Sequence, residues 1–140
     1  MSQNTRIIIG VIGNDIHVVA NRLLARGLRQ EGYLVCNLGV SVLPEDFLYA
    51  AIEHEADVVI ISSLNGEGEG WVQGFKQSFL NKQRSNILLY IGGNLAVGER
   101  SADEVERRYR DLGFDRAYHR PSSLDALFTD LKTDFNHVKH

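Results

Sequence analysis

The sequence predicts an α/β fold built on a doubly wound, five-stranded parallel sheet. Apolar runs rich in Val and Ile are continuous rather than alternating, as in strands buried on both faces. Helical patterns separate these runs, which calls for parallel βαβ units with right-handed crossovers. The length of 140 residues suits one domain, residues 1–140. This alternation favours the flavodoxin-like (Rossmann-like) strand order 2-1-3-4-5, with a ligand crevice at the carboxyl ends of strands 1 and 3.

Each strand is predicted from its own apolar run. A weaker fifth run completes the set, which is Ile7–Ile12, Leu34–Leu38, Val58–Ile61, Ile87–Ile91 and Arg116–Tyr118. Between and after these runs, apolar residues at helical spacing predict five helices. They cover 17–31, a segment that opens at Pro44 and runs through Ile52, 70–81, a segment from Ser101 to about Gly113, and one that opens at Ser122 or Ser123 and passes Leu131.

Local signals support the helix starts and ends. Pro44 suits a first helical turn, and the acidic residues that follow it suit a helix N-terminus. Ser101 and Glu104 have the spacing of a capping box. Gly32 ends the first helix, and residues 136–140 are expected to fray.

Composition excludes several classes of protein. The net charge of −3 gives no electrostatic footprint for nucleic acid. No apolar run approaches the roughly 18–20 residues that span a bilayer, and the first residues lack a signal-peptide pattern. The single cysteine, Cys36, allows no internal disulfide, so the expected location is the cytoplasm.

Small, polar, glycine-rich segments follow the first, third and fourth strands, and they begin at Gly13, Ser62 and Gly92. Glycines let a ligand approach the backbone closely, so three such neighbouring segments indicate a large ligand. A receiver domain would need an Asp after strand 3 and a Lys after strand 4, and neither is present. Asp15 would repel a flavin phosphate, and Gly10 and Gly13 do not have dinucleotide-fingerprint spacing.

Asp15 and His17 stand at the predicted switch point and leave three interpretations open: a metal site, an acid/base pair, or a polar segment that starts a helix. Asp15 is a common kind of helix cap beside an exposed histidine. A carboxylate that holds one imidazole N–H also orients the other nitrogen toward a metal. One histidine cannot build a zinc site, but it can supply a single axial ligand to a metal already held by a macrocycle, such as a cobalt corrin.

The combination Asp15-x-His17-x-x-Ala20, Ser62-x-Leu64 and Gly92-Gly93 resembles the D-x-H-x-x-G…S-x-L…GG signature of base-off/His-on cobalamin-binding domains. Beyond the signature, "GVIGNDIHVVANRLL", "PEDFLYAAIE", "ADVVIISSLNGEGE" and "IGGNLAVG" are similar to the small (S, sigma) subunit of glutamate mutase, also called methylaspartate mutase. The similarity covers nearly the whole chain.

The resemblance implies that His17 is the lower axial cobalt ligand and that Asp15 hydrogen-bonds it. Ser62, Ser63 and Leu64 would line the pocket for the displaced nucleotide tail. The implied cofactor-binding residues are Asn14, Asp15, Ile16, His17, Val18, Ser62, Ser63, Leu64, Gly92, Gly93, Asn94, Leu95, Ala96, Val97, Gly98 and Tyr118.

The implied activity is the adenosylcobalamin-dependent radical rearrangement of L-glutamate to (2S,3S)-3-methylaspartate. The implied partner is a large (E, epsilon) barrel subunit that binds glutamate, with two copies of each subunit. The small subunit is expected to be inactive alone. Two other interpretations stay open: a corrinoid carrier or B12-dependent sensor without isomerase activity, and a flavodoxin-like binding module in which Asp15 and His17 have no cofactor role.

The chain departs from the family pattern at two places. Ala20 stands where the signature has Gly, and its methyl group is expected to press on the nucleotide tail. His119, Arg120 and Pro121 replace a Pro- and Gly-containing turn. Arg120 is expected either to meet the phosphate of the tail or to face solvent. Trp71 is expected either to pack in the core or to anchor the partner or the cofactor edge.

Overall fold

All five strands run parallel in the order β2-β1-β3-β4-β5, which confirms the predicted topology. The computed structural model describes residues 5–13, 18–84, 86–121 and 123–138. The strands are β1 (Arg6–Val11), β2 (Leu34–Asn37), β3 (Val58–Ser63), β4 (Leu88–Gly93) and β5 (Arg116–His119). Each lies where an apolar run predicts it.

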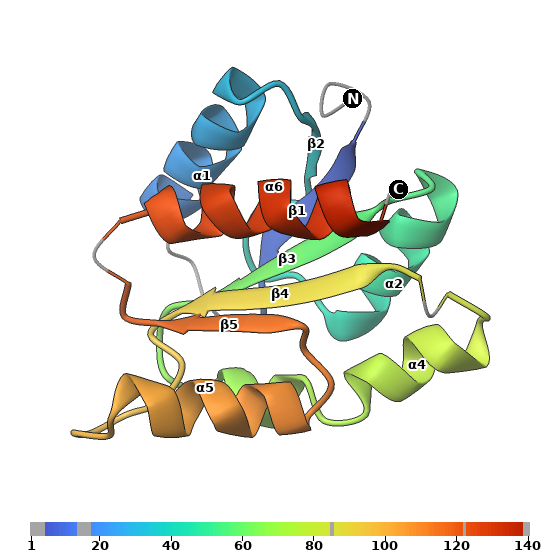
Figure 1. Cartoon of the computed structure of the whole chain (residues 1–140). Helices are drawn as coiled ribbons and strands as arrows, with labels where there is room; N and C mark the ends of the chain where they lie inside the picture. Colours follow the sequence, from blue (N-terminus) through green and yellow to red (C-terminus); the bar gives the residue numbers. More distant parts are fainter. Residues whose placement is uncertain (1–4, 14–17, 85, 122, 139–140) are drawn as a thin grey trace.

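Helices cover both faces of the sheet (Figure 1). On one face lie α1 (Val18–Gln30) and α6 (Asp125–Val138), and on the other lie α2 (Pro44–Glu53), α4 (Phe75–Asn81) and α5 (Ala102–Asp111). A short helix, α3 (Gly68–Trp71), follows β3. The side chain of Ser101 accepts a hydrogen bond from the Glu104 N–H, so the predicted cap of α5 is confirmed.

The alternation of side chains along each strand divides the apolar core into two layers. Ile7 and Ile9 pack with residues of α1 and α6, whereas Ile8 packs with residues of α2, α4 and α5. Because register partners in a parallel sheet point to the same face, the pairing Ile9↔Ile60 fixes which β3 residues join each layer. The same alternation places every functional residue described below.

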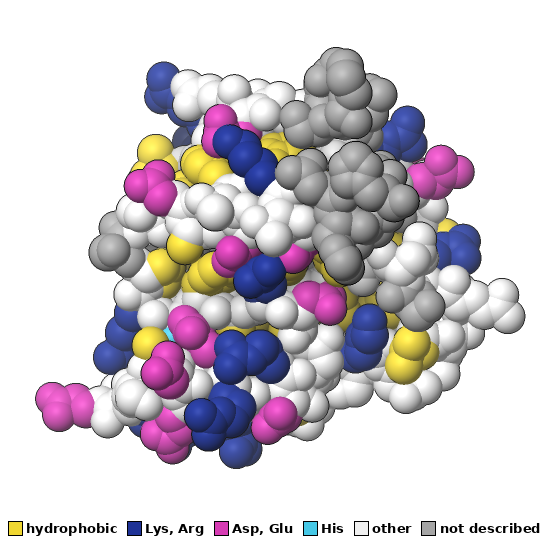
Figure 2. All heavy atoms as spheres, viewed as in Figure 1, with side chains coloured by type: hydrophobic (Ala, Val, Ile, Leu, Met, Phe, Trp, Pro, Cys, Tyr) yellow, Lys and Arg dark blue, Asp and Glu magenta, His cyan; other side chains and the backbone are white. Residues whose placement is uncertain are grey.

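The outer surface over α5 and α6 carries basic and acidic side chains intermingled (Figure 2). This agrees with the net charge of −3 and with the absence of a basic footprint in the sequence. Within the described residues, no helix is both long enough and apolar enough to cross a membrane.

Two boundaries differ from the sequence prediction. The helix expected over 70–81 is two helices, because Gly74 has a positive φ of 74° and separates α3 from α4. Ser62, Ser63, Gly92 and Gly93 were predicted to lie in loops but are the last residues of β3 and β4, where they pair with one another.

Candidate functional site

The carboxyl ends of the central strands place small side chains in one row on the face that α1 and α6 cover. The register pairs Val11 with Ser62, Ser62 with Gly92 and Gly92 with Tyr118. A Cβ added at Gly92 would lie 3.6 Å from the Tyr118 Cβ, an ordinary contact. Three of the residues predicted to bind the cofactor, Ser62, Gly92 and Tyr118, are therefore brought together.

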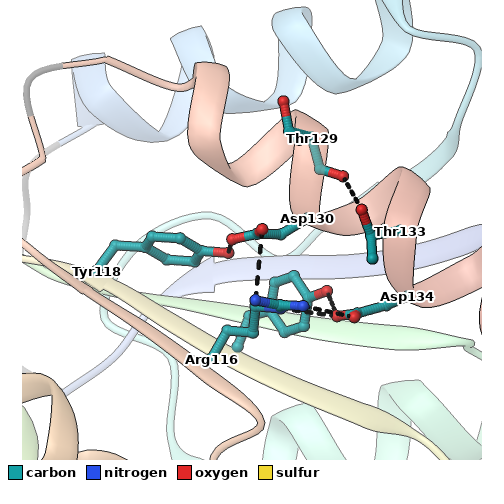
Figure 3. A network of polar contacts seen from close by, with 7 residues as sticks. Arg116, Tyr118, Thr129, Asp130, Thr133 and Asp134 are labelled. Carbon is teal, nitrogen blue, oxygen red and sulfur yellow. Dashed lines mark hydrogen bonds and ion pairs between the residues drawn. The ribbon is translucent and has the colours of Figure 1, made fainter.

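A polar network fixes Tyr118 against α6 (Figure 3). The Tyr118 hydroxyl donates to Asp130 at 2.7 Å, and Arg116 donates to both carboxylate oxygens of Asp134 at 3.0 and 2.8 Å. The Tyr90 hydroxyl also donates to Asp134. Burial, reinforced by the bonds to these carboxylates, raises the pKa of both tyrosines. Because its hydroxyl is already engaged, Tyr118 presents its ring to the row.

We expect Asp134→Ala to lower the free energy of unfolding by about 2 kcal/mol, because the change removes the acceptor of the Tyr90 hydroxyl and leaves Arg116 only its longer ion pair with Asp130. Chemical denaturation of the purified chain measures this. Thr133→Ala on the same helix is the matched control, since the Thr133 hydroxyl donates to the Thr129 carbonyl within α6 and the residue is exposed. Equal losses in the two variants would contradict a stabilising role for the network.

On the opposite face, the next residue of each strand forms a second row. The register pairs Ser63 with Gly93 and Gly93 with His119, and both Ser63 and His119 are buried. Gly93 has a φ of 123°, and a Cβ there would lie 2.5 Å from the Ser63 carbonyl oxygen and 2.8 Å from Leu64. Only glycine fits this position, so β3 and β4 end in close contact.

The loop after β4 is held from three directions. The Gly66 N–H donates to the Asn94 carbonyl at 3.0 Å, and the Tyr109 hydroxyl donates to the Leu95 carbonyl at 2.8 Å. Leu95 is buried, and its N–H donates to His119. Val97, by contrast, is 68% exposed at the rim of the sheet. The predicted binding segment Asn94–Gly98 is therefore anchored by its backbone and presents an apolar side chain outward.

Asn14, Asp15, Ile16 and His17 lie outside the described residues. The residues on either side are described: Gly13 precedes them, shortly after β1, and Val18 begins α1. The Gly13 N–H donates to the Val42 carbonyl at 2.8 Å, and Gly13 has a φ of 77°. A Cβ there would lie 2.4 Å from Nε1 of Trp71, so the indole packs directly on this backbone.

The contact with Gly13 bears on the role of Trp71. The indole is partly buried at the margin of the core layer under α2, α4 and α5. Core packing, one of the two expected roles, is therefore confirmed, and the indole also supports the start of the segment that carries Asp15 and His17.

Two buried polar residues have roles that the sequence did not predict. Asn21 is 2% exposed, and its Oδ1 accepts from Asn37 Nδ2 at 2.8 Å. Its own Nδ2 has no hydrogen-bond partner in the described part of the chain, and neither has Nε2 of His119. An asparagine one turn after His17, on the apolar side of the first helix, was the available signal for the first of these.

Among residues 5–13, 18–84, 86–121 and 123–138, no group of three or more His, Cys, Asp or Glu side chains could hold a metal ion. Glu69 is paired with Arg108, and this bond lowers the pKa of the Glu69 carboxyl. Glu69 therefore connects the segment after β3 to α5 rather than forming an acid pair with Glu67.

Comparison with known proteins agrees with this geometry. Residues 5–115 match the model of the B12-binding domain family. The glutamate mutase sigma subunit of Clostridium tetani is 42% identical over 130 residues, which are 93% of this chain and 95% of that protein. The corresponding subunit of Carboxydothermus hydrogenoformans is 39% identical over 132 residues, 94% of this chain and 96% of that one.

The chain belongs to the glutamate mutase sigma subunit family. The fold of this sigma-family chain is also found in the monomethylamine corrinoid protein of Methanosarcina barkeri, with a TM-score of 0.71 and 20% identity. That match covers 94% of this chain and 59% of the other. At this identity the likeness concerns the fold alone.

Proposed function

We propose that this chain is the cobalamin-binding small subunit of a glutamate mutase. The observation that carries the proposal is the similarity to sigma subunits along nearly the full length of both chains. The same stretch contains the complete three-part signature, apart from Ala20.

The described residues fit a large corrinoid with a nucleotide tail. In the row beneath α1 and α6, Gly92 and Ser62 contribute little side-chain volume, and Tyr118 contributes an aromatic ring. Asn21, buried at the start of α1, has an amide donor without a partner among the described residues. Small side chains at the strand ends and a buried donor at the start of α1 suit a ligand that is bulky and carries polar groups.

In this proposal His17 would hold the cobalt, and Asp15 would hold the His17 imidazole and set its donor strength. Ser62 would line the tail pocket, Ser63 and Leu64 would support it from the opposite face of the sheet, and the Asn94–Gly98 segment would close it. Adenosylcobalamin, when bound, supplies the radical chemistry that rearranges glutamate to 3-methylaspartate. The chain's own contribution is to bind the cofactor, orient it and exclude water from its lower face.

The relatives are named sigma subunits, which implies a second, catalytic subunit for them. We propose that this chain likewise works with a large barrel subunit that binds glutamate, in an assembly of two copies each. It is inactive alone in this proposal. A cytoplasmic location completes it, supported by a single cysteine in 140 residues.

Titration with adenosylcobalamin tests the cofactor part of the proposal. We expect an absorbance spectrum of the base-off, histidine-ligated form. Trp71, the only tryptophan, packs on Gly13, so its fluorescence should fall as the light-absorbing corrin binds nearby. An unchanged spectrum with unchanged fluorescence would exclude cobalamin binding.

A second assay separates the mutase from a corrinoid carrier. The chain is mixed with a large subunit, adenosylcobalamin and L-glutamate, and 3-methylaspartate is measured. Product that depends on all components supports the mutase. Cobalamin binding without product would identify a carrier or sensor instead.

A further inference from the structure

The His119 ring joins the end of β5 to the loop after β4, and the His119 backbone is bonded to α5. Its Nδ1 accepts a hydrogen bond from the Leu95 N–H at 3.1 Å. Its own backbone N–H donates to the carboxylate of Glu106, on α5, at 2.9 Å. The side chain is 5% exposed, so this connection lies inside the protein.

Arg120, the next residue, donates hydrogen bonds to the same loop from the surface. Its Nε donates to Asn94 Oδ1 at 2.9 Å, and its Nη2 donates to the Ala96 carbonyl at 3.2 Å. Its backbone N–H donates to the Gly93 carbonyl at 2.7 Å. Arg120 has a φ of 49°, a backbone conformation that residues other than glycine seldom adopt. The residue turns its guanidinium back onto the loop, a third role beside the two expected from the sequence.

The contact with Leu95 requires one protonation state of His119. An acceptor at Nδ1 must carry a lone pair, so the ring proton lies on Nε2, which is buried without a hydrogen-bond partner among the described residues. A second proton on the ring would set an N–H against the Leu95 N–H and break the bond. The tautomer is therefore dictated by the loop and not by any partner of Nε2.

The charged and titratable groups around the ring come from α5 and from Arg120, the residue after β5. Burial lowers the pKa of His119, the cation of Arg120 lowers it further, and Glu106 opposes both effects. Tyr109, also on α5, has its pKa raised to about 12, mainly by burial, so its hydroxyl remains a donor to Leu95. The loop from Asn94 to Gly98 contains no charged residue.

We propose that His119 and Arg120 are positioning residues that lock the Asn94–Gly98 loop in its cofactor-accepting conformation, and that the lock holds only while the His119 imidazole is neutral. Its effect on cobalamin rests on the proposed function, since that function makes this loop part of the binding site. Neither residue contacts cobalt or substrate in this proposal. Acidification unlocks the loop: below the pKa of folded His119, the Leu95 N–H loses its acceptor.

The test replaces His119 by two residues, of which only one offers a hydrogen-bond acceptor to the Leu95 N–H. Asn attaches Oδ1 to Cγ, as His attaches Nδ1, so His119→Asn keeps an acceptor for Leu95 but cannot be protonated. His119→Phe keeps a buried ring and removes the acceptor. His54→Asn, which removes an exposed histidine at the end of α2, is the matched control.

Two measurements are made on each variant. Amide hydrogen exchange of Leu95, followed by NMR on the cofactor-free chain, reports the lock directly. The Kd for adenosylcobalamin between pH 5 and 8, from absorbance titration, reports its consequence. Comparing His119→Asn with the unmodified chain at each pH cancels the titration of His17, which both contain.

We expect Leu95 protection in the unmodified chain to fall on acidification and in His119→Asn to stay constant. In His119→Phe it should be low at every pH, with a Kd roughly tenfold higher at pH 8, as expected for one lost buried hydrogen bond. Arg120→Lys, which keeps the charge and loses the fork, should raise the Kd severalfold and leave the pH profile in place. His54→Asn should match the unmodified chain.

Equal Leu95 protection in the Phe variant and the unmodified chain would overturn the lock, whatever the affinity for cobalamin. The same pH profile in His119→Asn and the unmodified chain would overturn its dependence on protonation. If the Phe variant does not fold, the Asn variant and Arg120→Lys still decide both points. A chain that shows the Leu95 behaviour but binds no cobalamin would retain the lock and refute the proposed function.

Discussion

His17→Ala is expected to abolish mutase activity in the presence of the large subunit and to weaken cobalamin binding at least 10–100-fold. That range is roughly what removal of a residue that only orients a metal ligand costs, and His17 is proposed as the ligand itself. Absorbance titration would then give no histidine-ligated spectrum. The folded chain should persist, because α1 begins at Val18 and packs through residues further along.

The control for this variant is His54→Ala. His54 is exposed at the end of α2, a helix that packs on β1, β3 and α4. Activity and spectrum should match those of the unmodified chain. If His17→Ala kept its activity, His17 would have no axial role, and the proposed site would need another ligand.

Gly93→Ala is expected to lower the free energy of unfolding by about 3 kcal/mol or more. The new Cβ would lie 2.5 Å from the Ser63 carbonyl oxygen, and the φ of 123° disfavours any side chain. For a chain of this length the melting temperature should fall by about 10 °C. Thermal unfolding followed by circular dichroism measures this.

Gly92→Ala, one residue earlier, separates folding from binding. Its Cβ would make an ordinary 3.6 Å contact with Tyr118, so the free energy of unfolding should change by less than about 0.5 kcal/mol. The methyl group would nevertheless stand in the row proposed for the nucleotide tail. We expect the Kd for adenosylcobalamin to rise about tenfold. Equal affinities of Gly92→Ala and the unmodified chain would remove Gly92 from the site.

The sheet was predictable because its signals are local and strong. Apolar runs such as Val58–Ile61 are short, rich in Val and Ile and separated by helical patterns, and parallel pairing with right-handed crossovers leaves few topologies. The polar residues that follow the runs were harder to assign. Serine and glycine are common in loops, yet Ser62 and Gly92 extend β3 and β4 because they pair with each other across the two strands.

The features that the sequence did not predict depend on contacts between distant segments. Arg116 and Asp134 are 18 residues apart, and nothing in either neighbourhood reveals that they bind each other. Among the described residues, Nε2 of His119 has no hydrogen-bond partner, and its Nδ1 accepts from a loop residue that precedes it by 24 positions. The break at Gly74 was missed because apolar spacing continues across it and only the positive φ separates the two helices.

Adjacent residues at the end of each central strand serve opposite sides of the sheet: Ser62 and Ser63, Gly92 and Gly93, Tyr118 and His119. One member of each pair faces the helix layer of α1 and α6, and the other lies on the face that α2, α4 and α5 cover, where His119 holds the loop after β4. Point substitutions can therefore alter ligand fit and loop anchoring independently. A single-residue insertion or deletion in any of these strands would exchange the two sets of side chains at once. This edge of the sheet should therefore tolerate substitutions, whereas an insertion or deletion within one of these strands should disrupt both ligand fit and loop anchoring.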